Sequence, residues 1–388
     1  AFKIVWQLLE NGVAVQSGEI APLNISAGEK ATFKVPCDRG EMAKEKEYFL
    51  RIAFQTRTDA DWAKAGHEVT FSEFKLAGNY TMPLKTSAAP PKIVSKKWET
   101  TVITDNGLSC TFDKKRGTLI SLSIKGHQLM AKSERRGDRS FDHDQALIDN
   151  YTRHWKLHLR KFDELKLGKL EKVGDSRLTV KTKKNKVVVQ ISSSFRSPKN
   201  AGFDEVQTWK IDGAGQIEVI ESVTPAGKLG DDVWVPRIGL YFQLSKDLQQ
   251  VAYYGKGPHG NYNDRSYGAW TAVHEANVMD HYVPYGKPQD HGNRESVRWL
   301  KLSDANGSGL KIIAPEPLAM CVLPYTQEEL ASARHTVDLP APSITELRIA
   351  ARVSGVGNGS CGPITREEYQ ALSAPVEYRF ILIPFISN

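Results

Sequence analysis

The sequence predicts an all-β protein, with a small β-sandwich followed by a much larger antiparallel β-sandwich. Three observations lead to this fold class. Short runs along the whole chain alternate apolar and polar residues, which is the period of a half-buried strand. Pairs that favour tight turns, such as Asn11-Gly12 and Asn106-Gly107, separate these runs. Only one long segment has a convincing helical pattern.

The N-terminal part contains the pattern of a small β-sandwich. Ile4, Trp6 and Leu8 fall on one face of a strand, and Asn11-Gly12 predicts a hairpin turn to a second strand that begins near Val13. Further alternation predicts strands over residues 31–35 and 50–54, and one that begins at residues 69–71. Paired prolines and small residues then occur over Ser87–Pro91 and favour an extended linker. We therefore predict domains over residues 1–85 and 98–388, with a linker over 86–97.

The second domain is predicted to be rich in strands and poor in helix. One helix is expected over approximately Gln145–Lys166, and capping boxes of the form Thr-x-x-Glu predict two short helices, one at Thr326–Glu329 and one at Thr365–Glu368. The expected strands cover residues 101–104, 110–112, 119–120, 187–191, 206–211, 217–220, 238–244, 310–313 and 378–383. A (β/α)8 barrel needs eight helices that alternate with strands. The second domain therefore cannot be such a barrel.

Composition excludes several classes of protein. The chain has 388 residues, of which 40% are hydrophobic and 25% charged, and this balance excludes a disordered chain. No run approaches the ~18 apolar residues of a membrane span. The net charge of +7 is spread along the chain, and its densest run is Lys181–Lys186, whereas nucleic-acid binding favours a clustered basic stripe. We expect a soluble protein that binds neither nucleic acid nor membrane, and composition does not assign it to a compartment such as the bacterial cytoplasm or periplasm.

Several motifs that suggest chemistry have ordinary structural explanations. Gly255–Gly260 matches a phosphate-binding fingerprint, but the residues that follow favour turns over the helix this fingerprint requires. His154 and His158 are spaced as zinc ligands on a helix, but no Glu lies between them, so we interpret them as part of an amphipathic helix. His281 and His291 are interpreted as structural. The acidic pairs Asp231-Asp232 and Glu367-Glu368 are adjacent in sequence and are expected on the surface.

The densest cluster of polar and aromatic residues lies between Val235 and Arg298. It has three parts, Val235–Leu240, Tyr254–Arg265 and Tyr282–Arg294, all rich in aromatic, amide and arginine side chains. Aromatic faces and planar hydrogen-bonding groups suit sugars, which present C–H faces and hydroxyl rims. The same residues could equally hold long loops rigid through ion pairs. Both interpretations stay open at this point.

These three segments resemble, in order and in spacing, the C-terminal domain of glycoside hydrolase family 2 β-galactosidases. The first domain resembles the immunoglobulin-like sandwich that precedes it in that family, through Trp6–Gly12 and Gly66–Val69. Tyr325–Leu330 and Gly355–Pro363 extend the resemblance over nearly the whole chain. It implies that the large domain is a supersandwich similar to galactose mutarotase.

The resemblance also implies what the chain lacks. In this family the two catalytic glutamates, and often Mg and Na ions, belong to a (β/α)8 barrel that precedes these domains. We therefore expect the chain to be the C-terminal region of a longer retaining β-galactosidase, or a separate small subunit. Because Ala1 leads almost directly into a strand, a truncated chain is favoured. The expected partners are the barrel, on the same or another polypeptide, and a galactoside, and the parent enzyme is expected to be homo-oligomeric.

No catalytic residue, cofactor or metal ligand is therefore predicted in this chain, which is expected to be inactive alone. One loop of the family's large sandwich carries a Trp that stacks on the sugar, and Cys361 occupies that position here. A thiol offers little stacking surface, so a sugar contact from Asn358 or Ser360 would be a hydrogen bond. The resemblance assigns eleven candidate residues to the substrate wall or to carbohydrate binding: Asn358, Ser360, Cys361, Arg237, His259, Asn261, Tyr262, Asp264, Arg265, Asn293 and Arg294.

Two other interpretations compete with this one. The chain could be a stand-alone carbohydrate-binding or mutarotase-like protein, although a mutarotase needs a general base and acid, normally a Glu and a His, on one face. It could also be a purely structural module that contributes subunit contacts.

Overall fold

The computed structural model describes residues 2–23, 25–26, 28–82, 89–131, 141–143, 148, 150 and 160–387. It divides into two compact units. The first comprises Ala1–Pro83 and Trp270–His274, and the second comprises Leu84–Ala269 and Glu275–Asn388. Nearly all regular structure is antiparallel strand, which confirms the predicted all-β fold class. Along the described ranges, no helix has the length and apolar character needed to cross a membrane.

The first unit is built on a sheet with the strand order β2-β1-β3-β4. Its strands are β1 (Phe2–Glu10), β2 (Val13–Ile20), β3 (Tyr48–Thr56) and β4 (Glu68–Ala77). The predicted hairpin joins β1 to β2, and both Asn11 and Gly12 have positive φ, as a tight hairpin turn requires. A Cβ at Gly18 would lie 2.8 Å from the Trp6 indole nitrogen, so glycine is needed for Trp6 to pack across β2.

The predicted strand over residues 31–35 is wrong, because these residues form no regular strand. Phe33 and Val35 nevertheless pack against the core that contains Trp6 and Leu50. The alternation therefore marks one side of an extended segment that covers the sheet. It does not mark a ladder of backbone hydrogen bonds.

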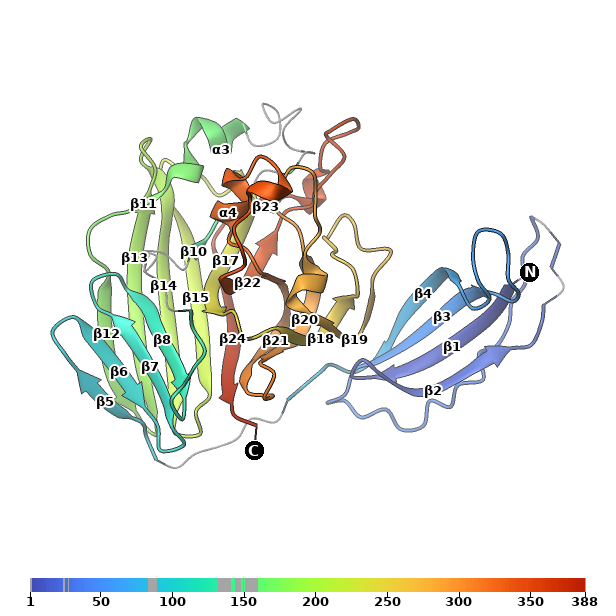
Figure 1. Cartoon of the computed structure of the whole chain (residues 1–388), viewed down its shortest axis with the longest axis horizontal. Helices are drawn as coiled ribbons and strands as arrows, with labels where there is room; N and C mark the ends of the chain where they lie inside the picture. The colour runs from blue at the N-terminus through green and yellow to red at the C-terminus, as the bar shows by residue number, and fades with distance from the viewer. Residues whose placement is uncertain are drawn as a thin grey trace. The chain divides into compact units, whose positions relative to one another are not determined.

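In the second unit, a five-stranded sheet faces part of a larger sheet (Figure 1). The smaller sheet contains β5 (Lys92–Ser95), β6 (Glu99–Ile103), β7 (Leu108–Asp113), β8 (Thr118–Ile124) and β9 (His127–Gln128). β5 lies within the stretch predicted as a linker. It pairs with β6 from Lys92 to Ser95, directly after the two prolines.

The larger sheet follows the order β10-β17-β22-β21-β24-β15-β14-β13-β11 among the described residues, and β12, β18 and β20 are joined to it as branches. Its strands are β10 (Phe141–Asp142), β11 (Glu171–Lys172), β12 (Arg177–Lys183), β13 (Lys186–Arg196), β14 (Ala201–Asp212), β15 (Ile217–Gly227), β17 (Arg237–Ser245), β18 (Gln250–Gly257), β20 (Asn293–Ser303), β21 (Gly309–Leu323), β22 (Ile344–Val353) and β24 (Val376–Phe385). Three more strands are β16 (Trp234–Val235), its partner β23 (Ala371–Leu372), and β19 (Trp270–Asn277).

The helices within the described ranges are short. They are α3 (Arg160–Glu164), α4 (Gln327–Ser332) and the 3-10 turns η1 (Leu167–Lys169), η2 (Val278–His281), η3 (Thr336–Asp338) and η4 (Glu367–Tyr369). Most of the helix predicted over Gln145–Lys166, including His154 and His158, lies outside the described residues, and the described part ends at Glu164.

One of the two predicted capping boxes forms. The Thr326 hydroxyl caps α4 by accepting from the Glu329 backbone N–H, and the Glu329 carboxylate accepts in turn from the Thr326 backbone N–H. The second box, Thr365–Glu368, is wrong. The Thr365 hydroxyl donates to the Gly355 carbonyl and so is not used as a cap, and Arg366 precedes a single 3-10 turn.

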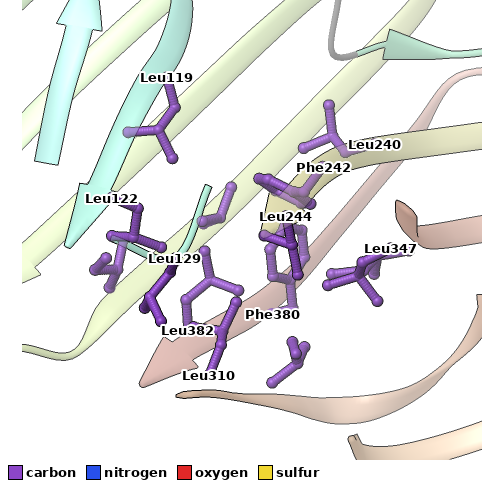
Figure 2. Close-up of a cluster of buried hydrophobic side chains, with 14 of the residues drawn as sticks. Leu119, Leu122, Leu129, Leu240, Phe242, Leu244, Leu310, Leu347, Phe380 and Leu382 are labelled. Carbon is purple, nitrogen blue, oxygen red and sulfur yellow. The ribbon is translucent and has the colours of Figure 1, made fainter. Parts of the chain in front are cut away.

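The main core lies between the two sheets of the second unit. Leu119 and Leu122 of the smaller sheet, together with Leu129, face Leu244, Phe380 and Leu382 of the larger sheet (Figure 2). The Phe112 and Trp209 rings pack edge to face with centroids 5.3 Å apart, which joins β7 to β14. This apolar layer holds the strands that carry the loops described below.

Replacing Phe380 with alanine tests this core. Phe380 is fully buried and packs against Phe242, so Phe380→Ala should lower the free energy of unfolding by about 3–5 kcal/mol. Urea denaturation followed by tryptophan fluorescence measures the change. Val173→Ala is the control, because Val173 is exposed and its truncation should change stability by no more than about 0.5 kcal/mol. A loss below about 1 kcal/mol for Phe380→Ala would contradict the assignment of this side chain to the core.

Candidate functional site

A pocket of about 260 Å³ lies within the second unit, where four loops meet. Tyr262 and Arg265 follow β18, and Val356 and Ser360 follow β22. A third loop, which leads into β20, supplies four residues, and the stretch before α3 supplies two. These six are Tyr285, Gln289, Asp290, His291, Ile148 and Asn150.

The loop after β22 is held in place mainly through its backbone. Asp264 accepts hydrogen bonds from the backbone N–H groups of Val356, at 3.0 Å, and Gly357, at 2.7 Å. A Cβ at Gly355 would lie 2.5 Å from the Asp264 carboxyl carbon, so this close approach requires glycine. The carboxylate therefore fixes where the loop begins.

Two further side chains hold the same loop from the pocket side. Arg265 donates from Nη2 to the Gly357 carbonyl at 3.0 Å and to Asn358 Oδ1 at 3.2 Å. Asn150 donates to the Gly357 carbonyl at 2.7 Å and accepts from the Ser360 hydroxyl at 2.8 Å. Ser360 is thereby positioned as part of the pocket wall.

Beneath the pocket lies a buried chain of ion pairs. Arg237 contacts Asp290 at 2.6 Å and Asp142 at 3.5 Å, and Asp142 also pairs with Arg348, which contacts Glu346 at 2.7 Å. All five side chains are at most about 6% exposed. Burial alone would lower the pKa of the Arg237 guanidinium. The negative charges of Asp290 and Asp142 have a larger combined effect, so the pKa is raised. Only the Asp290 carboxylate of this cluster lines the pocket.

Both ring nitrogens of His291 are engaged. Nε2 accepts from the Val283 backbone N–H at 3.0 Å, and Nδ1 lies 2.8 Å from the Gln289 carbonyl, which requires Nδ1 to carry the proton. Burial lowers the pKa of His291, so the ring is neutral at pH 7. This histidine therefore orders the loop, as predicted from the sequence, and has no free nitrogen for proton transfer.

The Tyr262 hydroxyl differs from its neighbours. Tyr262 is 8% exposed and lines the pocket, and its hydroxyl has no hydrogen-bond partner among the described residues. Burial raises the pKa of this hydroxyl well above its usual value, so it stays protonated. A buried hydroxyl without a partner is unfavourable, and a ligand oxygen that reached it would remove this cost.

Of the candidates predicted from the sequence, Tyr262, Arg265 and Ser360 line the pocket. Asp264 and Asn358 belong to the network that holds its loop. Arg237 lies behind Asp290 and does not reach the pocket surface. Cys361 is exposed and is not part of the lining.

The remaining four candidates lie apart from the pocket. Asn261 and Asn293 bond to each other's backbone and tie the loop after β18 to the start of β20. Arg294 is buried and donates to the Tyr253 hydroxyl at 3.1 Å and to the Gly292 carbonyl at 2.9 Å. His259 is exposed and contributes its backbone carbonyl to Asn261. The hydrogen bonds described here are structural. The roles of these four residues as sugar contacts stay predictions.

Seven lining residues were not among the candidates: Ile148, Asn150, Tyr285, Gln289, Asp290, His291 and Val356. Four of them lie in the segment Tyr282–Arg294. The composition of this segment indicated that it was functional, but did not indicate which of its side chains would line a pocket. Nothing in the sequence indicates that Ile148 would reach a loop more than a hundred residues away. Among the described residues, no group of three or more His, Cys, Asp and Glu side chains is arranged to hold a metal ion.

The amino-acid sequence was compared with models of known protein families, and two of them match. Residues 104–382 match the family described as "Beta galactosidase small chain". The chain belongs to this family. Residues 1–77 match a second family, "Beta-galactosidase, domain 4".

Curated relatives of this small-chain sequence are β-galactosidases. The enzyme of Priestia megaterium is 27% identical over 359 residues, which are 92% of this chain and 33% of that protein. The enzyme of Photobacterium profundum is 27% identical over 392 residues, which are 98% of this chain and 36% of that protein. The chain thus spans about a third of the length of these relatives. Among solved structures, the galactose 1-epimerase of Lactobacillus acidophilus has 8% identity and a TM-score of 0.45, with 77% of this chain and 100% of that chain covered.

The first prediction for the site concerns Asp264. Asp264→Ala removes the acceptors of the Val356 and Gly357 amides, so these amides should exchange with deuterium at least tenfold faster. A tenfold change means that the free energy of local opening falls by about 1.4 kcal/mol. Hydrogen-exchange mass spectrometry of the peptide over residues 354–363 measures this. Asp231→Ala serves as the control, because Asp231 is exposed. Unchanged exchange in Asp264→Ala would show that the loop is held by other contacts.

The second prediction concerns Glu295, next to the Asn261–Asn293 pair. Burial raises the pKa of Glu295 from 4.5 to about 7 in the folded state, and Asn293 donates a hydrogen bond to it at 2.7 Å. Between these pH values the unfolded chain has lost a proton that the folded chain keeps. The free energy of unfolding should therefore fall as pH rises, by about 2 kcal/mol, since the side chain keeps some contact with solvent.

Denaturant titrations at pH 4.5, 5.5, 6.5 and 7.5 measure this dependence. Because glutamine does not titrate, Glu295→Gln should not show this fall in the free energy of unfolding. The variant should therefore become more stable relative to wild type as pH rises. Glu316→Gln is the control, because Glu316 is exposed. A constant difference between Glu295→Gln and wild type at all four pH values would contradict the buried, protonated state of Glu295.

Proposed function

We propose that this chain is the non-catalytic C-terminal region of a retaining β-galactosidase, and that its pocket forms part of the wall of the galactoside site. The observation that carries the proposal is the pocket's content of carboxyl groups. A retaining glycosidase needs two carboxyl groups about 5–5.5 Å apart across the bond to be cleaved. The described lining has one, Asp290, and its carboxylate is paired with Arg237 at 2.6 Å.

A pair of neighbouring carboxyl groups elsewhere in this unit cannot act as the catalytic pair of a glycosidase. Glu205 and Glu221 lie side by side on β14 and β15, but they are only 3% and 0% exposed. Burial, and then the neighbouring Glu205, raise the pKa of Glu221 well above its usual value, and the Tyr378 hydroxyl donates to it. A glycoside has no access to this pair, which we interpret as a protonated structural contact.

The length of the relatives and the chemistry of the pocket support the same proposal. The curated relatives are β-galactosidases about three times as long as this chain, which leaves room for a separate catalytic domain. The pocket offers groups that suit a sugar, namely the Gln289 amide, the ring of Tyr285, and Tyr262, whose buried hydroxyl has no partner among the described residues. The missing acid, base and nucleophile would come from a barrel on the same or a partner polypeptide.

A mutarotase-like activity is less well supported. Such an enzyme needs a histidine and a carboxylate that are free to exchange protons with the sugar. His291 and Asp290 are the candidates in the described part of the pocket, and both are already engaged by protein groups.

Fragment complementation tests the proposal. The chain should show no hydrolysis of a chromogenic β-galactoside alone, and should raise the activity of a barrel-containing fragment of a longer relative at least tenfold. In the complemented enzyme, Tyr262→Phe should raise KM about five- to tenfold by removing a hydrogen bond to substrate. Tyr267→Phe should change nothing, because Tyr267 is fully exposed.

Two results would refute the proposal. Hydrolysis by the chain alone would show that it holds a complete reaction centre. Equal kinetics of Tyr262→Phe and Tyr267→Phe in an active complemented enzyme would remove the pocket from the substrate wall.

A further inference from the structure

The outer face of strands β12, β13 and β14 carries a basic groove of about 280 Å³. It is lined by Thr179, Lys181, Lys183, Lys186, Val188, Gln190, Thr208 and Lys210. None of these residues lines the pocket described above, so the groove is a separate feature of the second unit. It contains most of the lysine-rich run that stands out in the sequence.

Strand geometry explains why the lysines gather there. Successive side chains of a strand point to opposite faces, and Val187, Val189 and Ile191 of β13 are buried in the core. Their neighbours Lys186, Val188 and Gln190 must therefore face outward. Register then places Lys181 opposite Val188 and Lys183 opposite Lys186.

The third strand completes the groove. Lys210 lies opposite Val188 and Thr208 opposite Gln190, and the Gln190 amide donates to the Thr208 hydroxyl at 3.5 Å. Side chains two residues apart on one strand are about 6.6 Å apart. The ammonium groups thus form a patch on the scale of a few sugar rings.

Most of this positive charge is not neutralised within the unit. No carboxylate in the described part of the chain forms an ion pair with Lys181, Lys183 or Lys186. Lys210 pairs with Glu218 at 3.0 Å. Asp212 lies opposite Lys186 at the end of the ladder, but both of its carboxylate oxygens accept hydrogen bonds from Gln216. The groove therefore presents positive charge that suits a ligand with several negative charges.

The remaining lining residues limit what this ligand can be. No aromatic ring is among the described residues that line the groove, whereas binding of single-stranded nucleic acid relies on stacking of bases on such rings. Val188 is the one apolar side chain, which leaves no pockets for the anchors of a peptide. The hydroxyls of Thr179 and Thr208 and the amide of Gln190 suit sugar hydroxyls.

We propose that this groove binds an anionic polysaccharide, with its sulfate or carboxylate groups against Lys181, Lys183, Lys186 and Lys210 and its hydroxyls against the threonines and glutamine. Binding here is independent of the galactoside wall, so either proposal can fail without the other. The groove would hold the protein on an acidic polysaccharide and would take no part in bond cleavage.

Affinity measurements on the full chain test this proposal. The probes are a sulfated galactan, polygalacturonate and an uncharged galactan, measured by isothermal titration calorimetry at 50 mM and 200 mM NaCl. At least one charged polymer should bind at 50 mM NaCl, with an affinity that falls about tenfold or more at the higher salt, and the uncharged galactan should not bind. The two charged polymers distinguish sulfate from carboxylate as the preferred group.

Two triple variants with the same change in net charge locate the binding. Lys181→Gln/Lys183→Gln/Lys186→Gln should weaken binding at least tenfold. Lys199→Gln/Lys228→Gln/Lys246→Gln should leave it within twofold, because these lysines are exposed elsewhere on the second unit. Since five of these lysines are exposed and Lys186 is half-buried, circular dichroism should show both variants folded.

Several results would overturn the proposal. They are no binding of either charged polymer at 50 mM NaCl, equal losses in the two triple variants, or tighter binding of poly-glutamate or of single-stranded DNA than of both charged polysaccharides. Equal losses would mean diffuse attraction to the net positive charge, and the last result would assign the groove to another class of partner.

Discussion

The second unit depends on the burial of two arginines within its larger sheet. Arg237 and Arg348 are each at most 6% exposed, and a guanidinium cannot lose its charge to escape that environment. Each must therefore be met by carboxylates, and Asp142, Asp290 and Glu346 are drawn from three different parts of the chain. The removal of one partner from such a cluster typically costs 3–5 kcal/mol, because the remaining charge stays buried and unpaired. This electrostatic requirement places Asp290, and with it the loop that contains His291, at the floor of the pocket.

The strands were largely predictable from the sequence, because a half-buried strand repeats every two residues. Residues 187–191 alternate between the core and solvent in the way the pattern indicates. Residues 31–35 show the limit of this approach. Phe33 and Val35 pack on a core from one side only, and alternation does not distinguish such a covering segment from a strand within a ladder. The second capping box failed for a similar reason, since the Thr365 hydroxyl found a partner at Gly355 that lies outside its own segment.

The candidate site was predictable as a set of segments and less so as individual residues. Tyr262, Arg265 and Ser360 line the pocket, but Asn261, Asn293 and Arg294, which belong to the same rich segments, hold backbones in place. An amide or a guanidinium is equally suited to a sugar and to a carbonyl, so its type does not reveal which one it meets. That choice depends on the register between β18 and β20 and on the approach of the loop after β22, and neither is a local property of the sequence.

The way in which the loop after β22 is held also bears on which of its positions tolerate substitution. Asp264, Arg265 and Asn150 all bind the main chain at Val356 or Gly357, and this main chain is the same whatever side chains follow. The Cys361 side chain takes no part in these contacts, so its thiol can be exchanged for a bulky ring or an acid without loss of the anchor. A fixed base with an interchangeable tip would let the chemistry of this exposed end of the loop vary through changes in very few codons.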